Sequence, residues 1–447
     1  MKIAIIGGGA SGMIAAYLLD RRGHEVTVYE RQAMLGGHIR TLNQNIFPST
    51  DCPAILEMGV LEFPVEFTHF LQLMEELEVP LEPVEVGSGL FFQDGRHFLS
   101  QTCIGQNFHG LEKWREMLHI DSLYARSIGL WLKAHLTSMH DLHGQSMGQY
   151  LAPPSTQATW LKLLTMYSYS MAYETIDAFP ADLAIPALRR YVFSPWVRIK
   201  GGVYSYIQKI LDQFSGQVSL NTQILAIHRS NQAVQIRGLV IPGDQRLTWN
   251  GQPLGQSLGQ QRHEQRRKQP FEREFDRVIF ATPPDQVLRL LADPRPEEVR
   301  RFSAWQPNDI TTTLHQDPHL YQPYHLHHGS EFDFFQTPTG WGYNAYLNQL
   351  CGLPAEPAYY LAFNLEKGIA PEKIIHRQPH HTPLYTLEAF RSVDEVRATN
   401  GDHKTYHVGA YLGDGLHEGA TTSAMQVARA IGPAEVLAIP RIPCHAV

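Results

Sequence analysis

The first thirty residues alternate between apolar runs and a helical pattern. After Lys2, the apolar residues 3–6 form a short run that stops at glycine, which predicts a buried strand. Apolar side chains then recur at helical spacing until Gly23, and a second apolar run follows at residues 26–29. The helical positions are Met13, Ile14, Tyr17 and Leu18. This order predicts a βαβ unit, in which a helix joins two parallel strands.

Beyond this unit, the pattern predicts a mixture of helices and strands. An amphipathic helix is expected at residues 64–78, and a hairpin at residues 89–99, where Asp94-Gly95 marks the turn. Residues 110–191 are mainly helical, most clearly at 111–136 and 156–172. Strands are expected at 218–220, 223–229, 275–284, 308–315, 331–336, 340–347 and 359–364. A helix is expected at 285–291, and another that follows the glycine-rich residues 407–420 and continues through Ala430.

Residues 238–274 interrupt this pattern. They are rich in Gln, Gly and Arg and carry almost no apolar periodicity, so we expect a mobile hairpin insertion. A basic patch for an acidic partner is the alternative to a solvated loop, since Arg262, Arg266, Arg267 and Lys268 fall here. The proline-rich tail from Pro433 is expected to be poorly ordered.

Length, charge and cysteine content narrow the class of protein. A chain of 447 residues is longer than one typical core organises, which predicts two domains that can be interleaved. A formal net charge of −7 does not point to nucleic acid or an anionic membrane as partner. The four cysteines lack C-x-x-C spacing, which suits a reducing compartment. No apolar run reaches the ~18 residues of a membrane span.

A secretory signal is the other interpretation of Lys2 and the apolar run behind it. Three consecutive glycines, and the charged Asp20-Arg21-Arg22 where a cleavage site should lie, argue against a signal. We therefore expect a cytoplasmic protein, with peripheral membrane contact left open.

The glycines of the first turn carry a nucleotide-binding motif. Gly7, Gly9 and Gly12 have the G-x-G-x-x-G spacing, which allows a tight turn, a close approach of backbone to a pyrophosphate, and close packing of helix on strand. The pyrophosphate would meet free N–H groups at the helix start. Glu30 ends the second strand eighteen positions after Gly12, near the spacing at which an acid binds a ribose diol.

The segment after Glu30 makes a family resemblance specific. It contains Arg31, then Leu-Gly36-Gly37-His38, Arg40 and Thr41. A strand-end acid followed by this pattern resembles flavin amine oxidases, protoporphyrinogen oxidases and phytoene desaturases. In that group the second glycine turn lies against the flavin and its pyrophosphate, so Arg40 would be a phosphate or flavin neighbour.

Later segments extend the resemblance. Residues 57–63, 194–206 and 275–284 look like the three places where this group's chain returns to its flavin domain. Residues 407–420 look like the glycine-rich turn before the last helix, whose dipole would stabilise negative charge on the reduced flavin. Residues 346–349, 362–365 and 409–418 resemble a bacterial branch of predicted NAD/FAD-binding, amine-oxidase-like flavoproteins.

The resemblance implies an α/β fold with a Rossmann-like FAD-binding domain of the GR2 type, interleaved with a substrate domain of antiparallel sheet plus helices. It places the FAD-binding domain at 1–63, 194–295 and 401–432, the substrate domain at 64–193 and 296–400, and a tail at 433–447. No cysteine lies near the last motif, so the resemblance implies non-covalent FAD. The implied cofactor-binding residues are Gly7, Gly9, Ala10, Ser11, Gly12, Glu30, Arg31, Gly36, Gly37, His38, Arg40, Ile224, Gly409, Gly415, His417, Glu418 and Ala420.

Two departures from the group bear on its chemistry. Arg289 stands where amine oxidases of this fold commonly have a lysine that orders a water at flavin N5, and Leu416-His417 stand where they have an aromatic residue. An amine-binding aromatic cage is therefore not expected here. Arg289 and His417 become the candidate catalytic residues, with His417 as a proton donor or a donor to the flavin, or else only a structural hydrogen-bond partner.

The expected activity is hydride transfer from a small organic substrate to flavin N5, with O₂ or another acceptor reoxidising the flavin. The substrate is an amine or a hydrophobic unsaturated lipid or isoprenoid, and the departures favour the second. Flavin-dependent isomerisation without net redox and non-catalytic flavin binding are the alternatives. NAD as the main cofactor is the weaker interpretation, because the glycine-rich turn at residues 407–420 has no role in a simple dehydrogenase.

Other chemistries have weaker signals. Ser146 and Ser257 both lie in G-x-S-x-G, but neither follows a buried strand and opens a helix. The histidines, including His380 and His381, show no paired ligand spacing, so no metal is expected. Cys351 is a redox thiol or, more simply, a small buried apolar residue.

Overall fold

A computed structural model describes residues 1–47, 52–241, 268–327 and 329–432. Its central element is a five-stranded sheet in the order β18-β12-β1-β2-β8, in which all four neighbouring pairs are parallel. The strands are β1 (Lys2–Ile6), β2 (Glu25–Tyr29), β8 (Gln217–Ser219), β12 (Arg277–Phe280) and β18 (Thr405–His407). Segments from both ends of the chain therefore meet in one sheet.

The first helix confirms the predicted βαβ unit. Helix α1 (Ala10–Asp20) joins β1 to its parallel neighbour β2, and Ser11 to Leu19 are all buried. The last helix, α15 (His417–Ile431), packs against α1, and α9 (Tyr204–Gln213) packs beside it. Helices on the faces of a parallel sheet explain why its strands are continuous apolar runs.

A seven-stranded sheet, mostly antiparallel, forms the second large layer. Its order is β17-β13-β16-β15-β14-β5-β6, and only β14 and β5 pair in parallel. The strands are β5 (Ser88–Phe91), β6 (His97–Phe98), β13 (Gln306–His315), β14 (Phe332–Thr337), β15 (Gly340–Tyr346), β16 (Tyr360–Phe363) and β17 (Ile374–Leu384). Parallel and antiparallel sheets in one chain confirm the predicted α/β class.

Strand β17 has no counterpart among the predicted strands. It contains Pro379 and Pro383 and several polar residues, so no apolar alternation marks it. It lies at the edge of its sheet and pairs only with β13, which is where a strand tolerates proline.

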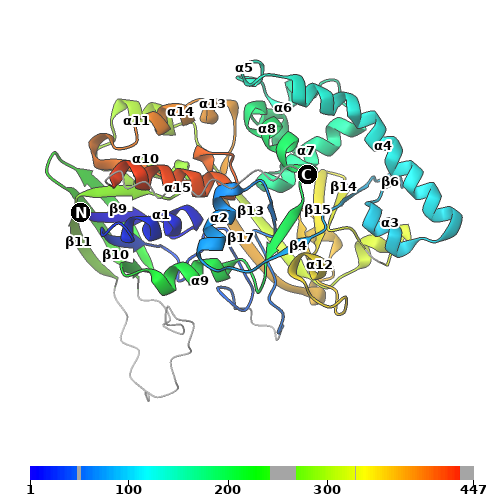
Figure 1. The fold of residues 1–447 in the computed structure, drawn as a ribbon, viewed down its shortest axis with the longest axis horizontal. Coiled ribbons are helices and arrows are strands. Elements are labelled where there is room, and N and C mark those ends of the chain that lie inside the picture. The colour runs from blue at the N-terminus through cyan, green and yellow to red at the C-terminus, as the bar shows by residue number, and fades with distance from the viewer. Residues whose placement is uncertain (48–51, 242–267, 328, 433–447) are drawn as a thin grey trace, which may run out of the picture.

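Helices cover one end of this sheet, as the periodicity of residues 110–191 predicts (Figure 1). The longest is α4 (Gly110–Leu136), and α7 (Thr156–Tyr169) and α8 (Ala181–Tyr191) pack against it. The shorter helices of this region are α3 (Gln101–Asn107), α5 (Met139–Leu142), α6 (Met147–Tyr150) and the 3₁₀ turn η1 (Tyr173–Ala178).

A three-stranded sheet corrects the interpretation of residues 238–274. Strand β9 (Thr222–Arg229) pairs with β10 (Val234–Val240), which pairs with β11 (Gln269–Phe275), all antiparallel. The hairpin is confirmed, but both ends of the supposed insertion belong to its strands. Three exposed charged residues stand together in β11 at positions 272–274, so no apolar alternation marks it as a strand. Residues 242–267 and the predicted tail lie outside the described residues.

Short elements connect these layers. A second three-stranded sheet has the order β3-β7-β4, formed by Phe63–Pro64, Trp196–Ile199 and Leu81–Val84. Helix α2 spans Thr68–Glu76, shorter than predicted because Pro64 belongs to β3. Helices α10 (Val287–Leu290), α11 (Pro296–Phe302), α12 (Leu347–Cys351), α13 (Leu387–Phe390) and α14 (Val393–Ala398) complete the set, with 3₁₀ turns between them. Among the described residues, none of these helices is both long and apolar enough to cross a bilayer.

Candidate cofactor and substrate cavity

One large cavity lies between the parallel sheet and the seven-stranded sheet. Its volume is about 900 Å³, at the upper end of the range typical of ligand pockets. Gly9 of the first turn, Gly37 of the second and Ala420 of the last helix all line it, together with Tyr343 of the seven-stranded sheet. The two ends of the chain therefore meet at the same hollow.

The glycines at its floor hold backbone segments in close contact. A Cβ on Gly12 would lie 2.0 Å from the Gly7 carbonyl O, and a Cβ on Gly37 would lie 2.9 Å from the Gly9 Cα. Gly7 and Gly37 also have positive φ values of 111° and 59°. Gly36 N donates to the Gly8 carbonyl at 2.8 Å, which ties the two glycine turns together. Only glycine fits such approaches.

Glu30 fixes the end of β2 beside this floor. Its Oε2 accepts a hydrogen bond from Gly8 N at 2.9 Å, and its Oε1 accepts one from Gln32 N at 2.8 Å. Arg40 is buried beneath the second turn, where its guanidinium donates to Gln32 Oε1 at 2.5 Å and to the Leu35 carbonyl at 3.4 Å. Burial lowers the pKa of Arg40, and the nearby Glu30 carboxylate partly opposes this shift.

The predicted residues divide into cavity-lining and supporting groups. Gly12 and Glu418 do not line the cavity, since Gly12 packs α1 on β1 and Glu418 holds α2. The cavity-lining residues are Gly7, Gly9, Ala10, Ser11, Glu30, Arg31, Gly36, Gly37, His38, Arg40, Ile224, Arg289, Gly409, Gly415, His417 and Ala420.

The N-terminus of α15 reaches the cavity through a tight turn. Asp414 Oδ1 accepts hydrogen bonds from Leu416 N at 2.9 Å and Gly419 N at 2.8 Å, which caps the helix. The Glu418 carboxylate accepts from His69 N at 3.0 Å and from Phe70 N at 2.9 Å, in the first turn of α2. Two acids thus hold the helix start in place.

His417 lies among aromatic rings. Phe63 and Phe70 each have a ring centroid 5.2 Å from the imidazole, and the Tyr206 hydroxyl lies 3.4 Å from Nε2. Burial lowers the pKa of His417 to about 3. The ring is therefore neutral near pH 7, which does not favour the predicted proton donation by an imidazolium, although a neutral ring N–H can still donate a hydrogen bond.

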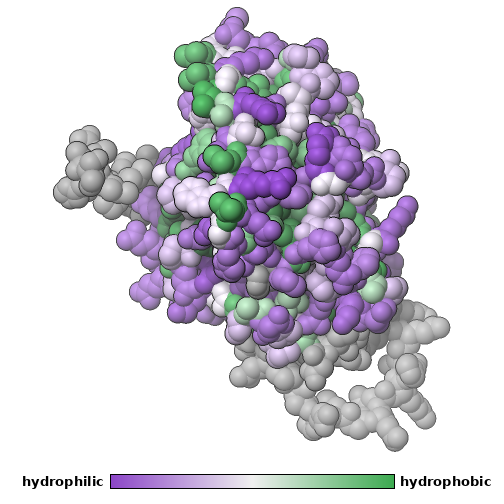
Figure 2. All heavy atoms as spheres, turned by 90° about the vertical axis from the view of Figure 1, so that its right-hand side faces the viewer, coloured by the Kyte–Doolittle hydropathy of each residue, from purple (hydrophilic) through white to green (hydrophobic). Residues whose placement is uncertain are grey.

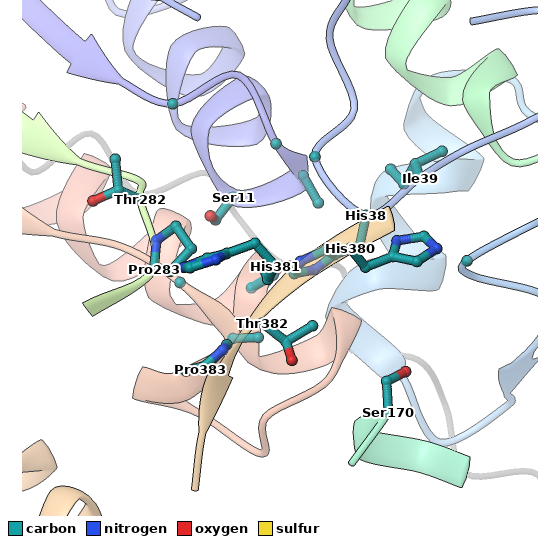
Figure 3. A pocket seen from close by; sticks show the side chains of 18 of the residues that line it. Ser11, His38, Ile39, Ser170, Thr282, Pro283, His380, His381, Thr382 and Pro383 are labelled. Atoms are coloured by element: carbon teal, nitrogen blue, oxygen red, sulfur yellow. Dashed lines mark hydrogen bonds between the residues drawn. The ribbon is translucent and has the colours of Figure 1, made fainter. Parts of the chain in front are cut away.

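Three histidines that sequence patterns do not connect also meet at the cavity (Figure 3). His38 Nε2 lies 2.7 Å from the carbonyl O of His381, and His380 Nε2 lies 2.9 Å from the carbonyl O of Met58. His381 Nε2 lies 3.1 Å from Asp285 Oδ2, and its Nδ1 lies 2.7 Å from Asp309 Oδ1. The Asp285 and Asp309 hydrogen bonds raise the pKa of His381, whereas burial lowers that of His380 to about 3.

Five tyrosines line the cavity on the side of the seven-stranded sheet: Tyr167, Tyr169, Tyr343, Tyr385 and Tyr411. The Tyr169 and Tyr385 rings lie edge to face at 5.7 Å, and so do the Tyr167 and Tyr343 rings at 5.2 Å. Burial raises the pKa of all five phenols, so they are neutral. These rings come from helix α7, from β15 and from the turns after β17 and β18. The motif at Leu416 is local, so it did not predict that aromatic rings from these distant segments line the cavity.

Glu62 is the buried acid of this wall. Tyr167 OH donates to its Oε1 at 2.9 Å, and Oε2 has no hydrogen-bond partner. Burial raises the pKa of Glu62 to about 8. The carboxyl is therefore mostly protonated near pH 7.

These residues fit a flavin dinucleotide. The two glycine turns form a cradle that a Cβ would fill, and the N-termini of α1 and α15 both face the cavity. A model of the family described as flavin containing amine oxidoreductase matches residues 10–313. The chain belongs to this family. Its cofactor is FAD.

The relatives of this flavin containing amine oxidoreductase differ in substrate. The flavin-dependent L-tryptophan oxidase RebO of Lentzea aerocolonigenes is 30% identical over 96 residues, which are 22% of this chain and 20% of the oxidase. A 4,4'-diapophytoene desaturase of Staphylococcus aureus is 41% identical over 58 residues, 13% of this chain and 12% of the desaturase. The chain thus aligns with a small part of their length. A fatty acid isomerase structure from P. acnes covers 96% of this chain and 98% of its own at 15% identity and a TM-score of 0.65, which shows the fold.

Ser146 and Cys351 do not line this cavity. Ser146 caps α6 through its hydroxyl, and Ser257 lies outside the described residues. Burial raises the pKa of the Cys351 thiol to about 12, which disfavours a reactive thiolate. Within the described part of the chain, no three His, Cys, Asp or Glu side chains are grouped to hold a metal ion.

Proposed function

We propose that this chain is an FAD-dependent oxidoreductase that takes a hydride from a small organic substrate. One observation carries the proposal: a single cavity is lined by Gly9 and Gly37, by the start of α15 at His417 and Ala420, and by Tyr343 of the seven-stranded sheet. Cofactor residues and aromatic walls share this space, so a substrate held by the tyrosines would lie beside the flavin.

The chain's own residues would orient the cofactor and exclude water. When bound, FAD supplies an electron-poor N5 that accepts a hydride. Backbone N–H groups at the α1 turn would bind the pyrophosphate, and the Glu30 carboxylate would accept hydrogen bonds from the ribose hydroxyls. Arg40 would support the second glycine turn. The start of α15 would face the ring that gains negative charge. His417 and Arg289 would be its neighbouring side chains, and no cysteine is among the described residues that line the cavity, which supports non-covalent binding.

The wall that the tyrosines and Glu62 form supports a hydrophobic substrate. Its tyrosines are neutral, and Glu62 is mostly protonated near pH 7, so this wall carries little negative charge to bind an ammonium group. An unsaturated lipid or isoprenoid therefore fits this wall, and an amine held by cation–π contact with the tyrosine rings stays the second candidate. Contact with a membrane surface would give access to such a substrate.

The chain would be organised as two interleaved domains. The FAD-binding domain would comprise residues 1–63, 194–295 and 401–432, and the substrate domain residues 64–193 and 296–400. A reducing, cytoplasmic location is supported by the thiols of Cys52 and Cys351, which form no disulfide.

Anaerobic titration of the FAD-loaded protein tests the activity. Unsaturated lipids, isoprenoids and amines are added in turn while the visible absorbance of the oxidised flavin is followed. A substrate is expected to remove this absorbance, to yield a product with two hydrogens fewer, and to let air restore the spectrum. A product of unchanged mass, formed only with reduced flavin, would instead indicate isomerisation. FAD that no compound in the panel reduces would contradict the proposal.

A further inference from the structure

Helix α4 carries an exposed row of mainly apolar side chains, which one acid, Asp121, interrupts near its middle. The row consists of Leu111, Trp114, Leu118, Asp121, Ala125, Ile128, Leu132 and Leu136. Its six large apolar members are between 54% and 88% exposed. Figure 2 looks onto the end of the molecule where α4 lies, and hydrophobic residues reach the surface there among hydrophilic ones.

This row is not the face that holds α4 on the protein. Ile120, Leu123 and Ala134 are the buried residues of the helix, and they lie on the side opposite the row. The helix thus has one apolar face in use and a second without a partner among the described residues. Contiguous exposed apolar surface of this kind marks an interaction site.

The spacing within the row indicates what covers it. Successive positions are three and four residues apart in alternation from Leu111 to Leu132, which is the pattern of a seam between two helices. Charged, exposed residues border the row on one side, at Arg115 and Arg126, and half-buried Met117, Tyr124 and Trp131 border it on the other. Asp121 in the middle of the row would be costly in lipid, which argues against a membrane surface as the partner.

The row is also symmetric about its centre. Counted from residue 123, Leu118 and Ile128 are equally distant, as are Trp114 and Leu132, and Asp121 and Ala125. Two antiparallel copies related by a twofold axis would therefore match large residues with large ones and Asp121 with the smallest. A parallel pair would place Asp121 against its own copy. We propose that α4 pairs with α4 of a second copy of this chain in an antiparallel, twofold-symmetric dimer.

Sedimentation velocity of the FAD-loaded protein over a range of concentrations tests the pairing. The wild type is expected to form dimers, and Leu118→Glu with Ile128→Glu to remain monomeric. Val299→Glu changes an exposed apolar residue on α11, away from the row, and should leave the dimer intact. Retained flavin absorbance shows that each variant is folded. A monomeric wild type, or a dimer insensitive to the double change, would overturn the proposal.

Cross-linking fixes the orientation of the pair. The double variant Leu118→Cys with Ile128→Cys should form a covalent dimer on mild oxidation, above the background of the wild type. Leu118→Cys alone should not, because the antiparallel pair keeps the two copies of this residue apart. Cross-linking of the single variant would contradict the twofold antiparallel arrangement. Row-dependent sedimentation of a monomer with anionic vesicles would show that lipid covers α4 instead.

Discussion

The Glu418 carboxylate on α15 accepts a hydrogen bond from the backbone N–H of Phe70 at 2.9 Å, although 348 residues separate the two along the chain. A second bond from His69 N at 3.0 Å joins it at the first turn of α2. The last helix therefore takes its position beside the cavity from the helix that follows β3. An acid at position 418 therefore has a structural role, to join α15 to α2, that needs no contact with the cofactor.

Replacing Glu418 should destabilise the fold. Glu418→Ala leaves two backbone N–H groups of α2 without their acceptor, at a cost of ~1–3 kcal/mol each when buried. Urea unfolding of the flavin-free protein measures the loss. Glu418→Gln keeps one acceptor oxygen and should lose less. Equal stability of Glu418→Ala and the wild type would show that the contact is not important for stability.

Gly37→Ala should weaken FAD binding more than it affects the fold elsewhere. The new Cβ would lie 2.9 Å from the Gly9 Cα and push the two glycine turns apart. Gly95→Ala is the matched control, because Gly95 also has a positive φ, of 87°, but nothing lies within 4 Å of its Cβ position. Fluorescence titration of flavin-free protein with FAD compares the two. Equal affinities for both variants would disprove the cradle.

Glu62 should make stability depend on pH. Its folded pKa of about 8 lies above the ordinary value of 4.5, so the folded state holds the proton more tightly. This contribution is full below pH about 4.5 and is lost as pH rises to about 8. Glu62→Gln should therefore lose less stability than the wild type over that window. Glu75→Gln, an exposed change on α2, should follow the wild type.

His381 should contribute stability at the acid side of neutrality. Its hydrogen bonds to Asp285 and Asp309 raise its pKa above 6.5, so the ion pair is fully present below that pH and fades as pH rises through the elevated folded value. His381→Gln should thus cost most near pH 6 and less near pH 9. His109→Gln, at an exposed position, should show no such trend in thermal unfolding. A cost that is independent of pH would contradict the ion pair.

Local sequence patterns predicted much of this protein but only some of the residues that line its cavity. The α/β class, the family and FAD follow from the turn at Gly9, the second turn at Gly37 and the glycine-rich start of α15, because these act through backbone geometry that a short motif specifies. The domain boundaries and the roles of Arg289 and His417 stay predictions. Strand β17 was not predicted, and neither was the position of Tyr343, Tyr385 and Tyr411 at the cavity.

The reason for this difference is the range of the contacts. His381 meets Asp285 across 96 residues, and β17 is a strand only because β13 pairs with it. Neither contact produces a regular spacing of apolar residues from which it could be predicted. Pro379 and Pro383 argue against a strand in any local analysis, and only the edge position of β17 permits them.

Binding of FAD to flavin-free protein tests the central claim, that both ends of the chain form one cofactor site. Ala420 lines the cavity at the start of α15, so Ala420→Leu should reduce FAD affinity as Gly37→Ala does. Ala430→Leu, at an exposed position near the end of the same helix, should leave affinity unchanged. Wild-type affinity in Ala420→Leu, with affinity lost in Gly37→Ala, would show that the last helix lies outside the site and would contradict the account.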